Sequence, residues 1–351
     1  MISEANRTVQ RWLFAFCGVV AVLIVFGGYV RLTRSGLSIV EWDPVTGVLP
    51  PIGAGAWRRA FAEYQRSPEF IKVNSTMTLG EFQRIFTIEW VHRLGARLAG
   101  FSYAVPFFVF VARKRIPRRD LGVYLVMGSL FVFQAIAGWV MVASGLKDRP
   151  SVSHFNLTVH LLLAFTLLAL ALWTALDHGR GPMGGQGRSK RSRASVVATM
   201  FLGVLGIQIA YGGFTAGLKA GHVSDTWPKM FGVLVPGGLF DSFTDLFEEP
   251  ATIVFIHRWF AFAVAAMAVL VVVACRGRED LGVRRAVRWI LVVVCLQIVL
   301  GVVTVLSSVQ MVVALAHQAT AIALFGASVY LLHSLRSLDA AKGPNWANEA
   351  T

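Results

Sequence analysis

The sequence predicts an all-α integral membrane protein whose eight transmembrane helices form two tandem four-helix bundles, related by a pseudo-two-fold axis as parallel repeats. Composition is the first reason: 56% of the 351 residues are hydrophobic, 15% are charged, and the mean hydropathy is +0.62. Soluble globular domains are less apolar and more charged. The second reason is that apolar stretches long enough to cross a bilayer core of roughly 30 Å occur eight times. They lie at 12–32, 86–112, 121–144, 156–176, 195–217, 251–275, 285–306 and 311–333.

The third reason is an internal repeat that covers most of the chain. The segment from Gly27-Gly28 to Pro51 recurs 185 residues later, from Gly212-Gly213 to Pro236. Four later features also return in the same order: His92-Arg93 as His257-Arg258, Gln134 as Gln297, Gly138 as Gly301, and His160 as His317. Because each half has an even number of spans, both halves enter the membrane in the same orientation. We expect an N-terminal half over 1–176, a Gly-rich cytoplasmic linker over 177–194 and a C-terminal half over 195–351.

Positive charges alternate along the chain as they do in multi-pass membrane proteins. The formal net charge is +14, and Lys and Arg gather in the connections at 113–119, 188–193 and 276–288. The positive-inside rule places this side of the protein, with both termini, in the bacterial cytoplasm. The spans would then be surrounded by the lipid of the inner membrane. The positive net charge is then explained by the orientation of the spans in the membrane, and we expect no nucleic-acid partner. The segments 33–85 and 218–250 face outward, and 57–81 is typical of a short amphipathic helix.

Four histidines lie inside the predicted spans, two in each half. His92, His160, His257 and His317 are about six to eight residues from the outer end of an even-numbered span, which at 1.5 Å per residue is a depth of roughly 9–12 Å. A buried ionisable side chain is costly, so it is a candidate for function. Paired neutral imidazoles are the axial ligands that a haem iron needs. Zinc is the competing metal, but its sites usually add Cys or carboxylate ligands, and we prefer haem.

Two arginines and four further histidines lie in the same spans or close to their ends. Arg93 and Arg258 come directly after the first histidine of each pair. On a helix they point about 100° away from it, toward a haem propionate or toward the outer headgroups. The remaining histidines lie at span ends or in loops and are expected to be solvated or interfacial; they are His154, His178, His222 and His333.

The two halves differ at one carboxylate. Glu89 precedes His92 by three residues, whereas Val254 holds that place before His257. Residues three apart share a helix face, so Glu89 would project toward the ligand of His92 and act there as a proton donor or acceptor. The alternative is that Glu89 orients a histidine or pairs with Arg93 or Arg97. We interpret this difference as a catalytic site in the N-terminal half and an electron-carrying site in the C-terminal half. The second half has Ala216 where the first has Arg31, which agrees with this interpretation.

With these residues in view, the chain resembles the haem A synthase family of bacterial inner membranes and mitochondria. The resemblance covers nearly the whole length and is carried by Gly27-Gly28-Tyr29-Val30-Arg31-Leu32-Thr33-Arg34-Ser35-Gly36, Glu41-Trp42, Glu89-Trp90-Val91-His92-Arg93 and the paired histidines. Some members carry a cysteine pair in the first outer loop. This chain has Cys17, Cys275 and Cys295 only within or at the end of spans, and so resembles the cysteine-lacking branch.

The resemblance implies an oxidoreductase that converts a methyl group of haem O to a formyl group and yields haem A for terminal oxidases. It implies a haem b cofactor on His257 and His317, with Arg258 nearby, and a substrate haem on His92 and His160, with Arg93 nearby and Glu89 in catalysis. Its expected partners are the enzyme that supplies haem O, the assembly machinery of terminal oxidases and an electron donor, for which a quinol is one candidate. A homo-oligomer is compatible with all of this.

Two other functions fit the four histidines. A quinol-linked membrane electron carrier with two bis-histidine haems needs the same ligands but no carboxylate, so Glu89 distinguishes it from the synthase. A non-enzymatic haem transporter or assembly factor would also permit a duplicated bundle, and it would release its haem chemically unchanged.

Overall fold

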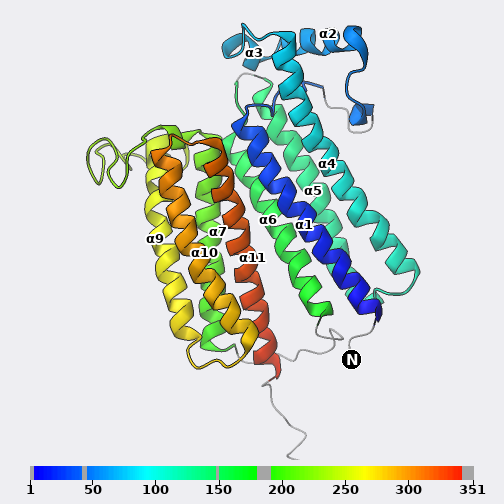
Figure 1. The fold of residues 1–351 in the computed structure, drawn as a ribbon, viewed down its shortest axis with the longest axis vertical. Coiled ribbons are helices and arrows are strands. Elements are labelled where there is room, and N and C mark those ends of the chain that lie inside the picture. Colours follow the sequence, from blue (N-terminus) through cyan, green and yellow to red (C-terminus); the bar gives the residue numbers. More distant parts are fainter. Residues whose placement is uncertain (1–3, 42–45, 148–149, 180–190, 342–351) are drawn as a thin grey trace, which may run out of the picture.

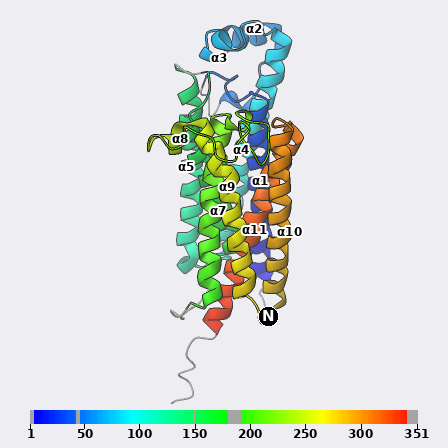
Figure 2. The ribbon, with the colours of Figure 1, turned by 90° about the vertical axis from the view of Figure 1, so that its left-hand side faces the viewer.

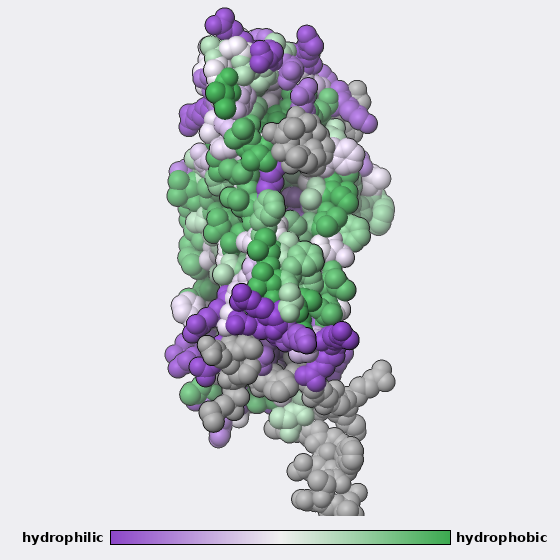
Figure 3. All heavy atoms as spheres, turned by 90° about the vertical axis from the view of Figure 1, so that its right-hand side faces the viewer, coloured by the Kyte–Doolittle hydropathy of each residue, from purple (hydrophilic) through white to green (hydrophobic). Residues whose placement is uncertain are grey.

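The computed structural model describes residues 4–41, 46–147, 150–179 and 191–341 of the chain. Within these residues eight helices are long and apolar enough to span a bilayer, as the sequence predicted. They are α1 (Glu4–Leu32), α4 (Leu79–Ala112), α5 (Leu121–Gly145), α6 (His154–His178), α7 (Arg193–Gly217), α9 (Pro250–Ala274), α10 (Leu281–Leu306) and α11 (Met311–Ala341). Figure 3 shows the corresponding apolar belt, with hydrophilic residues gathered above and below it.

The spanning helices stand side by side in two groups of four, α1, α4, α5 and α6 in one and α7, α9, α10 and α11 in the other (Figure 1). The described chain begins and ends at the same end of the molecule. Short helices occupy the opposite end (Figure 2): α2 (Gly53–Tyr64), α3 (Pro68–Lys72) and α8 (Asp245–Glu248), with the 3₁₀ turns Thr46–Val48 and Ala220–His222 between them and the spans. A third 3₁₀ turn, Arg118–Asp120, leads into α5 at the terminal end.

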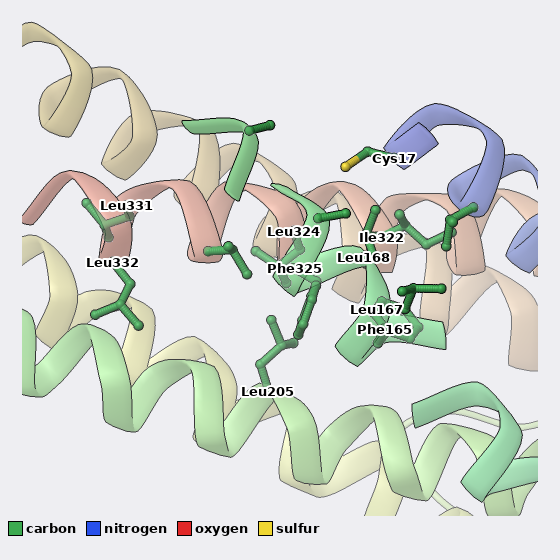
Figure 4. Packing of buried hydrophobic residues seen from close by; sticks show 14 of the residues in the cluster. Cys17, Phe165, Leu167, Leu168, Leu205, Ile322, Leu324, Phe325, Leu331 and Leu332 are labelled. Carbon is green, nitrogen blue, oxygen red and sulfur yellow. The ribbon is translucent and has the colours of Figure 1, made fainter. Parts of the chain in front are cut away.

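The main hydrophobic core lies where the two groups meet. α1, α6, α7 and α11 pack against one another there, and Figure 4 shows Leu167 and Phe165 of α6 beside Leu205 of α7 and Phe325 of α11. The rings of Phe165 and Phe325 meet edge to face, with centroids 4.9 Å apart. Side chains of this size dominate the burial energy of a core. α4, α5, α9 and α10 are therefore the outer helices, and each half has one histidine on an outer helix and one on an inner helix.

Three helices extend seven or eight residues beyond the predicted spans, α1 and α4 at their starts and α11 at its end, and the last two do so for local reasons. α4 begins at Leu79 instead of 86 because Thr78 and Glu81 form a capping box, in which each side chain binds the other residue's backbone N–H. α11 continues past 333 to Ala341, and Asp339 accepts hydrogen bonds from Ser192 and Ser195 at the start of α7, at 2.5–3.0 Å. Hydropathy alone misses such polar turns.

Two other segments differ from the expectation. The outer segment predicted as one amphipathic helix over 57–81 forms α2, α3 and the first turn of α4 instead. Ser67 caps α3, and Pro68 at the first helical position ends the preceding turn. The predicted linker over 177–194 overlaps the end of α6 and the start of α7, and its residues 180–190 lie outside the described residues.

Candidate functional site

Each of the four candidate histidines packs against a glycine of a neighbouring helix. A Cβ added at Gly27, Gly138, Gly212 or Gly301 would lie 3.3, 2.9, 3.2 or 3.1 Å from a ring atom of His92, His160, His257 or His317, respectively. Glycine is needed at these positions because any larger side chain would push the ring away. The Gly27-Gly28 and Gly212-Gly213 pairs thus have a shared function in their first members: each seats the histidine of its own half.

The second glycine of each pair seats a polar side chain of the other half. A Cβ at Gly28 would overlap the amide of Gln318, which donates a 2.9 Å hydrogen bond to the Ile24 carbonyl. A Cβ at Gly213 would lie 2.7 Å from the Thr158 hydroxyl. The repeated motif therefore performs two tasks, one within each half and one between the halves.

In the C-terminal half, the two histidine rings face each other. The centroids of His257 on α9 and His317 on α11 are 6.4 Å apart, and the ring planes are nearly perpendicular at 85°. Metal–imidazole bonds are about 2.0–2.1 Å long, so this separation suits one metal ion bound between a nitrogen of each ring. Both rings are half-buried.

Glutamines fix the rings. Gln134 and Gln297 lie 3.3 Å from the Nε2 atoms of His160 and His317, at equivalent places of the repeat. The Nδ1 atoms of both rings are buried, and no hydrogen-bond partner reaches them within the described residues. A buried nitrogen without a partner costs free energy, and a metal ion bound to it would remove that cost.

The N-terminal half orients its first histidine differently. Gln208 of α7 contacts His257 at Nδ1 (3.2 Å) and at the carbonyl oxygen (2.9 Å). The equivalent residue 185 positions earlier is Leu23, so His92 has no such amide. Instead its ring stacks on Phe26, with centroids 6.0 Å apart and planes at 10°. His160 is close enough to His92 to interact with it electrostatically.

The residues present fit haem better than zinc. The described residues contain no group of three or more His, Cys, Asp or Glu that could hold a metal ion, whereas a structural zinc site needs four ligands. Two imidazoles per half, one nitrogen of each second ring without a partner and apolar helix faces around them match the two axial ligands and the slot of a haem.

Arg93 and Arg258 hold the outer segments onto the histidine helices. Arg93 donates to the carbonyls of Ile39 (3.0 Å) and Glu41 (3.4 Å). Arg258 donates to those of Ser224 (2.5 Å) and Thr226 (3.1 Å), which are the same positions 185 residues later. From the sequence, the expected partners of these two guanidinium groups were a haem propionate or the outer headgroups. The structure adds a third: in both halves the guanidinium groups clamp a loop over the site.

Glu89 is buried with 3% of its surface exposed and accepts five hydrogen bonds. Oε2 accepts from the Ser38 amide (2.8 Å) and hydroxyl (2.7 Å) and from the Ile39 amide (2.9 Å). Oε1 accepts from Arg93 at 2.6 and 3.1 Å. The pairing with Arg93 that the sequence left open is therefore present, and the carboxylate joins α4 to the outer segment. At the Val254 position, the second half instead has an apolar contact with Ala220 and Met230.

The expectation that the other four histidines are solvated or interfacial is wrong for three of them. His154, His178 and His333 are 7%, 4% and 1% exposed, and only His222 is exposed. The three are buried because each has a polar partner: Phe247 O at 2.8 Å, Tyr124 Oη at 2.5 Å and Asp177 Oδ1 at 2.8 Å, respectively. The last pair links α6 to α11. Hydropathy cannot reveal partners that come from other helices.

A second buried carboxylate lies outside the spanning helices, and its burial could not be expected from the sequence. Glu69 of α3 is 5% exposed and accepts from the Tyr64 hydroxyl at 3.2 Å, while Asn74 donates to that hydroxyl at 2.7 Å. Burial raises the pKa of Glu69 to about 7, with a smaller contribution from the charge of Glu89. The spacing in Tyr64–Glu69–Asn74 carries no recognisable motif, and the burial of Glu69 becomes visible only in the folded structure.

The stability of the segment formed by α2 and α3 should therefore fall as pH rises. In the unfolded segment Glu69 titrates near 4.5, and in the folded one near 7. Stability is highest below pH 4.5, falls as pH rises toward 7 and levels off above it, by roughly 3 kcal/mol at most. Limited proteolysis of α2–α3 at pH 5 and pH 8 should show faster cleavage at pH 8, and Glu69→Gln should remove the difference. An unchanged difference in the variant would contradict this origin.

Known proteins resemble the chain over nearly its full length. The family model of the COX15-CtaA cytochrome oxidase assembly protein matches residues 10–329. A protein named heme A synthase from Paramagnetospirillum magneticum is 40% identical over 347 residues, covering 95% of this chain and 96% of its own. Those of the same name from Maricaulis maris and Bradyrhizobium diazoefficiens are 40% and 38% identical, over 93% and 97% of this chain and 96% and 95% of their own. With its paired histidines in the duplicated bundle, the chain belongs to the COX15-CtaA family of cytochrome oxidase assembly proteins.

Proposed function

We propose that the chain makes haem A by oxidising a methyl group of haem O to a formyl group. The observation that carries this is the occurrence of two histidine pairs at equivalent places of a duplicated bundle, in a chain whose relatives over more than nine-tenths of its length are named heme A synthase. The reaction adds an oxygen atom and removes hydrogen from the methyl carbon. Two methyl hydrogens are exchanged for one oxygen atom, a four-electron oxidation of the carbon, so the reaction requires an oxidant, for which dioxygen supplied with electrons by the donor is the candidate, and a proton acceptor at the site.

The two halves would divide the task. Residues 195–351 would hold haem b as a resident cofactor, between His257 and His317, and residues 1–176 would hold the substrate haem between His92 and His160. Gln208, which fixes His257 on two atoms, supports a permanent ligand in the second half. Leu23 in its place, with Glu89 close by, suits a first half that must exchange its haem and act on it.

A bound haem b supplies a one-electron redox centre. The residues around the substrate site would do the remaining work. Arg93 and Ser38 hold Glu89 in place and close the outer segment over α4, which excludes water from the site. Glu89, which accepts all five of its hydrogen bonds, would be the catalytic residue that takes up a proton from the substrate. Arg93 would lie beside the substrate haem and Arg258 beside the cofactor, and each would hold its outer segment in the clamping position.

The protein would lie in a bacterial inner membrane with both termini in the cytoplasm. The basic connections at 113–119 and 276–288 support this orientation. Both described chain ends lie at that end, and the short helices α2 and α3 lie at the other (Figure 1). The enzyme that supplies haem O and the oxidase assembly machinery would be its partners, with a quinol as the candidate electron donor and assembly of identical chains as a compatible arrangement.

The test is to express the full chain in cells that also make haem O, purify it in detergent, and identify the extracted haems by chromatography and mass. The expected result is haem A together with haem b and haem O. Extraction of haem b alone, with haem O present in the same membranes, would contradict the synthase and favour an electron carrier with two bis-histidine haems.

A further inference from the structure

The substrate haem brings two propionate carboxylates into the N-terminal half, and these need cationic partners there. An unpaired charge at a partly desolvated site is costly. Arg93, the partner expected from the sequence, already binds Glu89 and the carbonyls of Ile39 and Glu41. Its donors are committed to the clamp, so other cations have to complete the site.

Arg31 is positioned to do so. It lies four residues after Gly27 on α1, and residues four apart lie on one face of a helix, about 6 Å apart along its axis. Gly27 is the residue on which the His92 ring packs. Arg31 is therefore one turn outward from the ligand contact and is half-buried. Ala216 holds this position in the other half, above Gly212, so the cation belongs to the N-terminal site alone.

Two further cations converge on Arg31 from the ends of the inner helices. Arg34 and Lys219 follow α1 and α7 at equivalent places of the repeat, both in the left-handed region with φ of 53° and 55°. Lys219 is close enough to Arg31 and Arg34 to interact with both, although it comes from the other half. In the part of the chain that the structure describes, these three side chains make no hydrogen bond or ion pair.

Three like charges that crowd together repel one another unless an anion lies among them. Glu69 is a carboxylate close to Arg34 and Lys219, but it is buried and already bound to Tyr64. It cannot balance three cations. The cluster is therefore suited to an anion that carries at least two charges and arrives from the bundle side, one turn above His92.

We infer that Arg31, with Arg34 and Lys219 beside it, forms the carboxylate-binding subsite that holds the propionates of the substrate haem. This deepens the proposed function and rests on it. The subsite would distinguish the two haem sites, because the cofactor site has Ala216 where the substrate site has Arg31. It would also orient the substrate, since propionates fixed at the outer end turn the opposite edge of the porphyrin toward the bundle interior.

Binding, without turnover, tests the inference. The full chain, isolated with its tightly bound haem and placed in phosphatidylcholine nanodiscs, is titrated with haem O and separately with its dimethyl ester, and the Soret band is followed. The wild type should bind the free acid about tenfold or more tightly than the ester, because charge-assisted hydrogen bonds are lost in the ester. Arg31→Ala should weaken binding of the acid by a similar factor and leave binding of the ester unchanged. Arg31→Lys should recover part of the loss, and the exposed Arg58→Ala is the matched control on the outer surface.

The outcomes separate the two claims. If the wild type takes up no second haem, the proposed substrate site is wrong. If the second haem binds but acid and ester bind equally, or Arg31→Ala discriminates between them as the wild type does, the subsite is wrong while the synthase stands. An effect of Arg31→Ala that appears only when phosphatidylglycerol is added would show that the cluster binds lipid phosphate, and would overturn the inference.

Discussion

Replacing His257 with alanine is expected to remove the tightly bound haem b from the purified protein, whereas replacing His92 should leave it in place. His257 would lose its iron bond, and the amide of Gln208 that fixes its ring cannot substitute for an imidazole ligand. The Soret absorbance per protein should fall by tenfold or more, a loss of at least about 1.4 kcal/mol of binding free energy. Haem extraction and absorbance of the detergent-purified variants provide the measurement.

Leu296→Ala is the matched control, because Leu296 is apolar, 45% exposed and adjacent to Gln297 on α10. It should retain haem b. Full haem b in His257→Ala together with its loss in His92→Ala would reverse the assignment of the halves. Loss in both variants, with intact helix content by circular dichroism, would mean that haem b occupies both sites.

Glu89→Gln is expected to stop the formation of haem A while haem b remains bound. Glutamine keeps the size of the side chain but presents an amide N–H to the donors of Ser38, Ile39 and Arg93, and it cannot take up a proton. Loss of a general acid or base typically costs about 10²–10⁴-fold in rate. Haem O should accumulate in the preparation and haem A should fall to background, as measured by chromatography of extracted haems.

A positioning role would give a different pattern. Ser38→Ala removes one donor to Glu89 but keeps the carboxylate, so a catalytic Glu89 should leave this variant with a loss of roughly 10- to 150-fold, the value of one hydrogen bond to a charged group, and a smaller loss than Glu89→Gln shows. Equal losses in Ser38→Ala and Glu89→Gln, with faster proteolysis of residues 33–41 in both, would show that Glu89 acts only by fixing the outer segment.

Much of the protein could be predicted from the sequence. The eight spans follow from apolar length alone, because a bilayer accepts only helices or closed barrels. The histidine pairs follow from the repeat, since a position kept polar twice at the same depth is costly unless it has a function. The start of α4 and the end of α11 could not be predicted in this way. Thr78 acts as a helix cap and Asp339 contacts another helix, and average hydropathy contains no information on either.

The same distinction between sequence and tertiary structure applies to the candidate site. The sequence by itself determined the bundle, its repeat and the four histidines, because these depend on periodicity and burial cost, which are local properties of the chain. Only the tertiary structure decided that Arg93 and Arg258 clamp equivalent carbonyls, that Glu89 is held by Ser38 and Ile39, and that Lys219 meets Arg31 from the other half. Those pairings join residues 32 to 188 positions apart, and which donor finds which acceptor depends on how the helices pack.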